Sequence, residues 1–350
     1  MARYAYDRLT ALDNSFLLFE DGHSHMHVAS TAIFDAGPLA TPDGGIDIER
    51  IHDYIASRLH RIPRYRQRLE SIPIEGRPVW VDDDRFNLLY HVRHTSLPRP
   101  GDERQLKRLS GRIASQALDR GKPLWELWIV EGLSENRFAM ISKVHHCMID
   151  GISGVDLFEV LMDASPEAAW EESHAYLPRG VPGRLELLRD EVVDRLTAPL
   201  RLAMQAVRNP LGVLQTIGTG ASALVETLFA GARMPSETPL NMPIGPYRRF
   251  DWLAMDIADL KAVKNVLGGS LNDVVLAIVT GALRQYLSEH GVELTRACVR
   301  SVVPVSLRRP EDHLTLGNMV TAMLPRLPIG VADPVERLRR VAAEMNRLKE

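Results

Sequence analysis

The chain has 350 residues, of which 45% are hydrophobic and 25% are charged, and its formal net charge is -3. This balance is typical of a soluble globular protein of two subdomains, and without a basic excess it does not favour nucleic acid as a partner. Its two cysteines, Cys147 and Cys298, form no CxxC pair, so a disulfide framework and a zinc site are not indicated and a reducing cytoplasm fits best.

The N-terminal part begins with a polar stretch that lacks the apolar core of a secretory signal peptide. The segment "MHVASTAIFD", residues 26–35, predicts a strand. It is followed over 46–62 by apolar residues at helical spacing, and Pro63 is expected to end that helix.

A second helix is predicted over about 103–118. Two apolar runs follow, 123–133 and 137–146, joined by the polar turn "SEN". They predict a hairpin of two strands. Residues 152–164 then have helical period, so a helix is predicted shortly after the end of the second strand.

Residues 165–246 are punctuated by prolines between helical pieces and contain no convincing strand, which favours a crossover between subdomains. Within it, the apolar stretch 211–231 carries Glu226 and several glycines. We expect this stretch to be peripheral at most. A helix packed over the apolar mouth of a site is the favoured interpretation, and contact with lipid is the alternative.

A second α/β unit follows. It comprises a helix over 270–291 and strands within 296–308 and 319–330. The last segment, 333–350, opens with Asp333 as cap, Pro334 at the first helical position and Glu336 closing a capping box. Its other end carries no cap, so we expect a missing C-terminal part.

The stretch "FAMISKVHHCMIDG", residues 138–151, places two adjacent histidines at the end of an apolar strand. Because side chains alternate along a strand, His145 and His146 are expected to point to opposite faces. That spacing disfavours joint ligation of one metal. Taken alone, the motif is equally compatible with two hydrogen-bonded core histidines followed by a capping aspartate, Asp150.

Several short motifs in order extend the comparison: "LTALDNSFLLFE" (9–20), "IPRYRQRL" (62–69), "PLW" (123–125), "HHCMIDG" (145–151), "NDVVLA" (272–277), "VPVSLR" (303–308) and "GN" (317–318). With them the chain resembles the bacterial wax ester synthase/acyl-CoA:diacylglycerol acyltransferase family. That family lies within the superfamily of chloramphenicol acetyltransferase-like enzymes and condensation domains.

The resemblance implies an α/β fold of two chloramphenicol acetyltransferase-like subdomains. Their mixed sheets are flanked by helices, and the active site lies in a channel between them. We expect an N-terminal subdomain over 1–165, the crossover over 166–246, and a C-terminal subdomain over 247–350. The last is expected to be incomplete, because the family's members continue for roughly another hundred residues, with a "NVPGP"-like motif that is not found here.

The resemblance also implies a mechanism. The second histidine, here His146, is expected to be the general base that takes a proton from the hydroxyl of diacylglycerol or a fatty alcohol, which attacks the thioester of an acyl-CoA. An imidazole, with an ordinary pKa near ~6.5, suits this role at neutral pH. The sequence contains no G-x-S-x-G elbow, which is consistent with direct transfer. Acyl-CoA is a co-substrate, and no cofactor or metal is expected.

Further roles follow from the same resemblance. His145 is expected to support His146 from the inward side. Asp150 would pair with an arginine, for which Arg64 and Arg66 are the candidates, although both could equally be solvated charges. Gly151 would shape the turn.

The remaining candidates lie elsewhere in the sequence. Asn272 and Asn318 are candidate oxyanion donors. A capping box with Ser270 explains Asp273 without catalysis. Pro123 and Trp125 are expected to line the channel, although core packing is the simpler explanation for the tryptophan.

Two other functions remain open. The chain could be a condensation-type enzyme that takes its acyl group from a carrier protein, or a non-catalytic lipid-binding remnant. We expect a cytoplasmic protein that is peripheral at the inner membrane or at lipid inclusions. The acceptor alcohol and the acyl chain length are not determined by the sequence.

Overall fold

The computed structural model describes residues 6–73, 78–148, 161–162, 171–172, 174–208, 236–306 and 320–349. The chain forms two compact units. Unit 1 comprises Met1–Leu200 and Ile244–Asp251, and unit 2 comprises Arg201–Pro243 and Trp252–Glu350. Each unit has its own clusters of buried apolar side chains.

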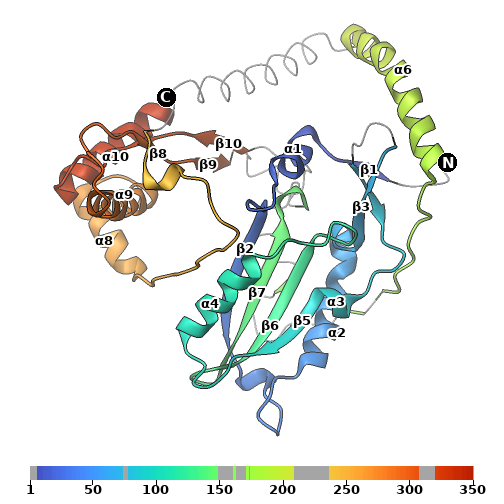
Figure 1. The fold of residues 1–350 in the computed structure, drawn as a ribbon, viewed down its shortest axis with the longest axis horizontal. Helices are drawn as coiled ribbons and strands as arrows, with labels where there is room; N and C mark the ends of the chain where they lie inside the picture. The colour runs from blue at the N-terminus through green and yellow to red at the C-terminus, as the bar shows by residue number, and fades with distance from the viewer. Residues whose placement is uncertain are drawn as a thin grey trace. The chain divides into compact units, whose positions relative to one another are not determined.

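The main sheet of unit 1 has four strands in the order β2-β7-β6-β5 (Figure 1). Their bounds are β2 His27–Asp35, β5 Val92–Ser96, β6 Trp125–Leu133 and β7 Arg137–His145. β7 pairs antiparallel with both β2 and β6, whereas β5 and β6 are parallel, so the sheet is mixed. The predicted strand at 26–35 and the predicted hairpin are confirmed.

The turn of that hairpin is built from the "SEN" residues. Glu135 and Asn136 have positive φ angles of 64° and 53°. Two successive left-handed residues give the turn a twist that matches the right-handed twist of the strands it joins. The turn and a register shift between Val130 and Leu133 together place Trp125 opposite Val144, next to the end of β7.

The first two predicted helices are present as α2, Ile48–Arg58, and α4, Glu103–Ala114. α2 continues into the 3₁₀ turns η2, Leu59–Arg61, and η3, Pro63–Arg66. α4 ends four residues before the predicted limit of 118. At that end the buried Lys143 ammonium donates hydrogen bonds to the carbonyl oxygens of Ile113 and Gln116, at 3.1 and 3.0 Å. The sheet therefore caps the helix there.

Several further elements lie in unit 1, and the last of them, the helix α6, continues past Leu200 into unit 2. A three-stranded sheet has the order β1-β4-β3. The bounds are β1 Asp7–Arg8, α1 Ala11–Phe19, η1 Gly37–Leu39, β3 Gln67–Ser71, β4 Pro78–Asp82, α3 Leu88–His91, η4 His146–Met148 and α6 Arg184–Arg208. α1 packs against η4, the short turn that follows β7.

The proline-rich crossover is only partly described. Its described parts, 171–172, 174–208 and 236–246, contain no strand. They include η5, Pro239–Asn241, besides α6. The apolar stretch 211–231 and most of the predicted helix at 152–164 lie outside the described residues.

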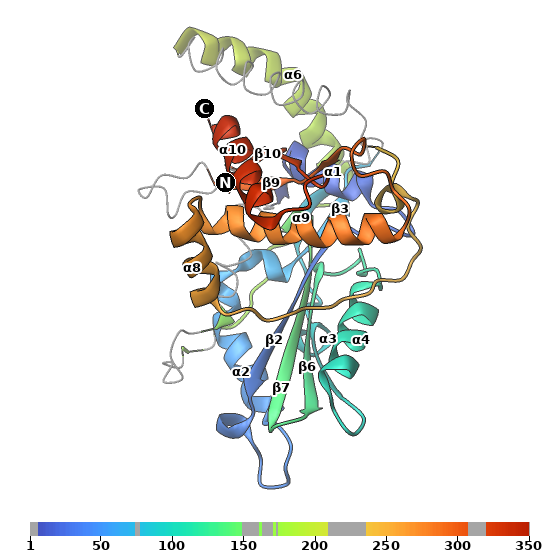
Figure 2. The same cartoon turned by 90° about the vertical axis from the view of Figure 1, so that its left-hand side faces the viewer.

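From Trp252 onward, the described residues of unit 2 contain three α-helices: α8 Ile257–Leu267, α9 Leu271–Glu289 and α10 Pro334–Lys349. Figure 2 shows α8 at the N-terminal end of the long helix α9. Two short antiparallel pairs accompany them, β8 Val299–Arg300 with β11 Arg326–Leu327, and β9 Val303–Ser306 with β10 Val320–Met323. The predicted helices at 270–291 and 333–350 are confirmed as α9 and α10. The strands predicted at 296–308 and 319–330 are each divided into two short strands in their described parts, and α8 was not predicted.

The helices of unit 2 pack through a small core. α9 contributes Val274, Leu276 and Ala277, and α10 contributes Leu338, Val341 and Met345. Asp333 caps α10 as predicted, since its Oδ1 accepts from the Glu336 N–H at 2.7 Å. The Glu336 carboxylate instead pairs with Arg340, at 2.8 Å.

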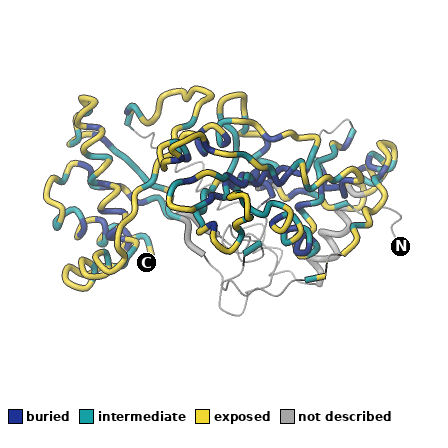
Figure 3. Tube along the Cα trace, turned by 90° about the horizontal axis from the view of Figure 1, so that it is seen from below, coloured by how far each residue is buried: buried dark blue, intermediate teal, exposed yellow. Residues whose placement is uncertain are grey.

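Burial differs between the elements. Buried stretches are concentrated in parts of the trace and exposed stretches in others (Figure 3). Buried residues are frequent along β6 and β7, whereas α8 contains none. Among the described residues, no single helix has the length and apolar character needed to cross a membrane. In the described part of the chain, α8 and α9 meet those criteria only when taken together, with a bend of 101° between them.

Candidate active site at the end of strand β7

The backbone around the two histidines is held from both neighbouring strands. His145 is the last residue of β7, and its N–H donates to the carbonyl of Leu124 at 3.0 Å. The His146 N–H donates to the carbonyl of Met26 at 2.8 Å. These bonds end the strand at a fixed place and start the 3₁₀ turn η4 at His146.

His145 is buried, with 1% of its surface exposed, and both ring nitrogens have partners. Nδ1 accepts the backbone N–H of Cys147 at 3.1 Å, and Nε2 lies 3.3 Å from Oε2 of Glu20. Since a backbone N–H can only donate, the ring proton is assigned to Nε2, which donates to the carboxylate. Burial lowers the pKa of His145 and the Glu20 carboxylate opposes that shift. The ring is therefore neutral near pH 7.

His146 is half-buried and opens η4. Its ring stacks on Phe16 of α1, with centroids 4.0 Å apart and an angle of 25° between the planes. We predicted that strand alternation would direct the two histidines to opposite faces. In the structure the chain leaves the strand at His146, so the turn and the Phe16 contact set the direction of this ring, and alternation alone does not.

A carboxylate not singled out from the sequence, Glu20, forms the centre of a cluster here. It follows α1, and its side chain is 9% exposed. Arg120 Nη2 lies 2.5 Å from Oε2, and His25 Nδ1 and His27 Nε2 lie 3.3 and 3.6 Å from Oε1. Burial alone would raise the pKa of Glu20, but the Arg120 hydrogen bond and the neighbouring imidazoles hold it below its ordinary value. The carboxylate is therefore ionised.

His27 lies beside this carboxylate at the start of β2, directly opposite His145 in the register. Its side chain is 4% exposed, and neither ring nitrogen has a hydrogen-bond partner in the structure. Burial, with Lys143 nearby, lowers the pKa of His27 to about 3. The short distance to Glu20 is therefore a contact with a neutral imidazole, and no ion pair forms there at neutral pH.

Thiol nucleophilic catalysis and metal binding are the two other chemistries that such residues could support. Burial raises the pKa of the Cys147 thiol to about 12, so this thiol is not a nucleophile at neutral pH. Over the described parts of the chain, no group of three or more His, Cys, Asp or Glu side chains has an arrangement that could hold a metal ion.

The structure describes only some of the other residues that were predicted to form the site. Asp150, Gly151 and Asn318 lie outside the described residues. Arg64 lies in η3, where Nη1 donates to Gln67 at 2.8 Å and the guanidinium covers the Trp80 ring. Arg66 covers the Tyr176 ring at 4.6 Å. The pairing of either arginine with Asp150 stays a prediction.

The start of α9 shows how the two predicted polar residues differ. Asn272 is exposed in the first turn. Asp273 is buried and forms a complete capping box with Ser270, with bonds of 2.7 and 3.2 Å in the two directions. The capping explanation of Asp273 is therefore confirmed, and a role of Asn272 in catalysis stays a prediction.

Pro123 and Trp125 are both buried next to the end of β7. The Trp125 indole donates to the Tyr65 carbonyl at 2.8 Å and stacks on His91, with centroids 4.6 Å apart. Trp125 belongs to the main apolar core. This is the simpler of the two explanations given for the tryptophan, and a channel-wall role stays a prediction.

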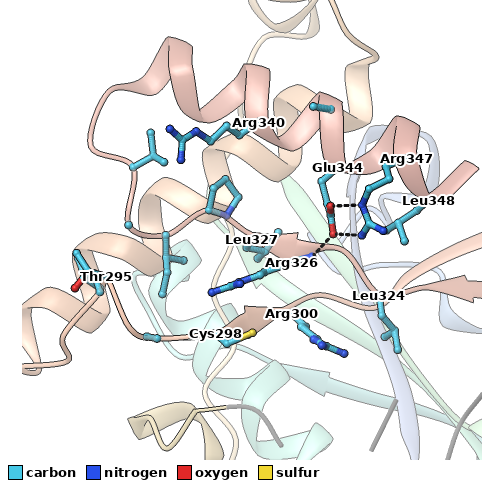
Figure 4. A pocket seen from close by; sticks show the side chains of 17 residues that line it. Thr295, Cys298, Arg300, Leu324, Arg326, Leu327, Arg340, Glu344, Arg347 and Leu348 are labelled. Atoms are coloured by element: carbon cyan, nitrogen blue, oxygen red, sulfur yellow. Dashed lines mark hydrogen bonds and ion pairs between the residues drawn. The ribbon is translucent and has the colours of Figure 1, made fainter. Parts of the chain in front are cut away.

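Unit 2 has an open pocket of about 1520 Å³ between α10 and the β8–β11 pair (Figure 4). Four arginines line it: Arg300, Arg326, Arg340 and Arg347. Arg347 is paired with Glu344 at 2.9 Å, and Glu344 also accepts the Arg326 backbone N–H at 3.2 Å (Figure 4). None of the predicted site residues that the structure describes lines this pocket.

Two domain models of one protein family match the chain. Residues 9–275 match the wax ester synthase/diacylglycerol acyltransferase catalytic domain, and residues 316–350 match the C-terminal domain of the same family. A Mycobacterium tuberculosis protein named "Probable diacyglycerol O-acyltransferase tgs1" is 35% identical over 347 residues, which are 98% of this chain and 71% of that protein.

Another relative from Mycobacterium tuberculosis, from strain CDC 1551, is 34% identical over 343 residues. The match covers 97% of this chain but 66% of the relative, so the chain spans just under two thirds of that protein's length.

Solved structures show the same relationship. A wax ester synthase/diacylglycerol acyltransferase from Marinobacter aquaeolei VT8 aligns with a TM-score of 0.60 and 25% identity, over 98% of this chain and 72% of that one. The first condensation domain of the calcium-dependent antibiotic synthetase aligns with a TM-score of 0.56 at 16% identity, which shows a shared α/β fold. The chain belongs to the wax ester synthase/diacylglycerol acyltransferase family.

Proposed function

We propose that the protein is an O-acyltransferase that transfers a long-chain acyl group from acyl-CoA to the hydroxyl of diacylglycerol or a fatty alcohol, with His146 as general base. The observation that carries the proposal is the arrangement at the end of β7. His146 is the half-buried imidazole of the pair and stacks on Phe16, whereas His145 is buried with both nitrogens engaged. Membership of the family supplies the substrate classes.

The proposed reaction needs one proton to move twice. His146 takes the proton of the acceptor hydroxyl as the oxygen attacks the thioester carbonyl. The carbon–sulfur bond then breaks, and the imidazolium returns the proton to the CoA thiolate. No acyl-enzyme forms, because the acceptor itself is the nucleophile. The buried Cys147 thiol next to His146 is consistent with this route, since it stays protonated.

The developing oxyanion of this reaction needs donors aimed at the carbonyl oxygen. Asn272 and Asn318 remain our candidates for that role. Because both acceptor classes are lipids, we also propose that the protein acts at the surface of a membrane or lipid inclusion.

The test is release of free CoA from palmitoyl-CoA, measured separately with hexadecanol and with diacylglycerol, together with detection of the ester product. Loss of a general base lowers the rate by about 10²–10⁴-fold. We therefore expect His146→Ala to lower CoA release by that factor in whichever arm is active.

His94→Ala is the matched control. It removes another histidine of unit 1, on β5, that pairs with Glu131 at the surface. This variant should retain the parent rate. Undiminished CoA release by His146→Ala would refute the assigned base. A parent chain that binds acyl-CoA but forms no ester in either arm would favour a lipid-binding role instead.

A further inference from the structure

The Glu20 carboxylate follows helix α1 and takes no part in the proposed proton transfer, although it contacts His145. We propose that Glu20 is a positioning residue for His146 and that it acts through His145. This inference rests on the proposed function, because it assigns Glu20 to the orientation of the proposed base.

The first argument is the placement of α1. Phe16 and Glu20 are one helical turn apart, so their side chains lie on the same side of the helix. Phe16 stacks on the His146 ring, and Glu20 reaches the His145 ring. A single helix end therefore contacts the two adjacent histidines with two different side chains.

The second argument is the path from the carboxylate to the base. Glu20 accepts the Nε2 proton of His145, and the opposite nitrogen of that ring accepts the Cys147 N–H at 3.1 Å. The backbone of His146 is thus held on one side by its own bond to Met26 and on the other by the bond from Cys147 to His145. Rotation of the His145 ring would release the second of these bonds.

The third argument is the charge balance around Glu20. The charged and titratable groups that face it are Arg120, His25, His27 and His145. Arg120 holds the carboxylate ionised, and His27 is neutral. An ionised carboxylate accepts a hydrogen bond but cannot donate one, so it admits only the His145 tautomer with the proton on Nε2. That tautomer leaves Nδ1 free to accept from Cys147.

The substitution Glu20→Gln keeps the shape of the side chain but lets its amide present either a donor or an acceptor to His145. Displacement of a reacting group by about 1 Å costs about 10²-fold in rate. We expect a fall in kcat of that order with little change in the KM for acyl-CoA. A general loss of folded protein would lower the active fraction without slowing the remaining enzyme, so the unfolding temperature is measured alongside.

The matched control is Glu131→Gln. Glu131 is also a carboxylate of unit 1 that contacts a histidine, His94, and a backbone N–H, that of Ile46 at 3.1 Å. It is on β6 away from η4, so this variant should keep the parent kcat. An equal fall in both variants would contradict the inference.

A double-variant cycle tests the path through His145. His145→Asn cuts the link to Glu20 while keeping an oxygen that can accept from Cys147. In this background Glu20→Gln should cause no further fall in kcat. A second fall as large as the first would show that Glu20 acts by another route.

Nitrogen-15 NMR of the histidine rings gives a readout independent of activity. The parent should show His145, assigned by its loss in His145→Asn, with the proton on Nε2, and Glu20→Gln should shift that signal towards a mixture of tautomers. An unchanged tautomer would overturn the inference. If Glu20→Gln does not fold, Glu20→Asp, which withdraws the carboxylate by one methylene and keeps its charge, replaces it in the kinetic and NMR tests.

Failure of the inference and failure of the proposed function are distinguishable. An inactive parent, or an active parent with an active His146→Ala, counts against the function. An active parent that depends on His146 but not on Glu20 counts only against the inference.

Discussion

The two histidines at the end of β7 are chemically different because of what surrounds each of them. His145 is enclosed, neutral and hydrogen-bonded on both nitrogens, whereas His146 starts a turn and stacks on Phe16. Adjacent residues of the same type therefore separate into a support and a candidate base. Their difference arises from contacts with α1, which is more than a hundred residues earlier in the chain.

His27 gives a prediction about pH. Its pKa is about 3 in the folded protein against 6.5 for the ordinary group, so the unfolded chain binds more protons between these values. The free energy of unfolding contributed by His27 is therefore fully present above pH 6.5 and is lost as the pH falls towards 3. For one such proton the slope reaches about 1.4 kcal/mol per pH unit.

We expect His27→Leu to reduce this slope. At pH 7.5 the variant should be at least as stable as the parent, because the replaced imidazole has no hydrogen bond to lose. The measurement is urea unfolding at several pH values between 4 and 7.5, over the range in which the parent stays folded. Identical slopes for parent and variant would contradict the prediction.

The sequence alone identified the two histidines as candidate site residues but did not identify Glu20 as their partner. The "HHCMIDG" motif is local, so it could be recognised directly. Glu20 and His145 are 125 residues apart, and nothing in the "LFE" stretch by itself shows which side chain that carboxylate will meet. The one signal in the sequence was that the stretch ending in Glu20 and the stretch with the histidines are both among the motifs that the chain shares with the family.

At the scale of elements, the contact between α4 and β7 depends on Lys143. Its ammonium is fully buried and lies 3.3 Å from Glu126 as well as against the two carbonyls at the end of α4. Burial lowers the pKa of Lys143, and Glu126 opposes the shift. One side chain thus satisfies the helix end and attaches it to the sheet.

We expect Lys143→Met to lower the free energy of unfolding by about 2–3 kcal/mol, because the carbonyls of α4 and the Glu126 carboxylate lose a buried charged partner. Glu126 keeps its contacts with Arg93 and Trp128, at 3.2 and 3.0 Å, which limits the loss. Chemical denaturation measures the difference.

Lys107→Met is the control for that substitution. Lys107 is on α4, the helix that Lys143 contacts, and it pairs with Asp251, whose side chain is 83% exposed. Pairs of this kind are worth at most about 1 kcal/mol. Equal destabilisation by the two variants would show that burial of Lys143 is not the cause.

The elements themselves were largely predictable, because helical and strand periods are local properties. α2, α9 and α10 agree with the apolar spacing, and the β6–β7 hairpin agrees with its polar turn. The end of α4 was predicted too late. Its apolar period continues to Leu118, but the helix ends at Ala114. Just past this end, Lys143 from the sheet donates to the carbonyl oxygens of Ile113 and Gln116, which are then satisfied without a further helical turn.

At the scale of the whole molecule, unit 2 carries exposed apolar side chains in one continuous stretch of the chain. In unit 2 the stretch from Leu253 through α8 exposes several large apolar side chains, with Leu253 at 74% and Val266 at 81%. Exposed apolar surface of this kind promotes association with other apolar surfaces. Neither side chain belongs to a core cluster of the unit.

We expect the double variant Leu253→Lys/Val266→Lys to bind less of a hydrophobic fluorescent dye and to scatter less light at high concentration than the parent. Leu177→Lys, which replaces a side chain 84% exposed elsewhere in the chain, should change either signal little. Dye fluorescence and static light scattering over a concentration series provide the measurement. Equal effects of both variants would show that exposure alone, irrespective of place, determines association.

The sequence by itself determined most of the elements, the hairpin, the family and the position of the histidine pair, because each depends on residues that are close in the chain or on short motifs in order. Only the tertiary structure decided which groups meet at that pair. The Glu20 carboxylate, the Phe16 ring and the capping ammonium of Lys143 act across long sequence separations, where packing alone brings them within hydrogen-bonding or stacking distance.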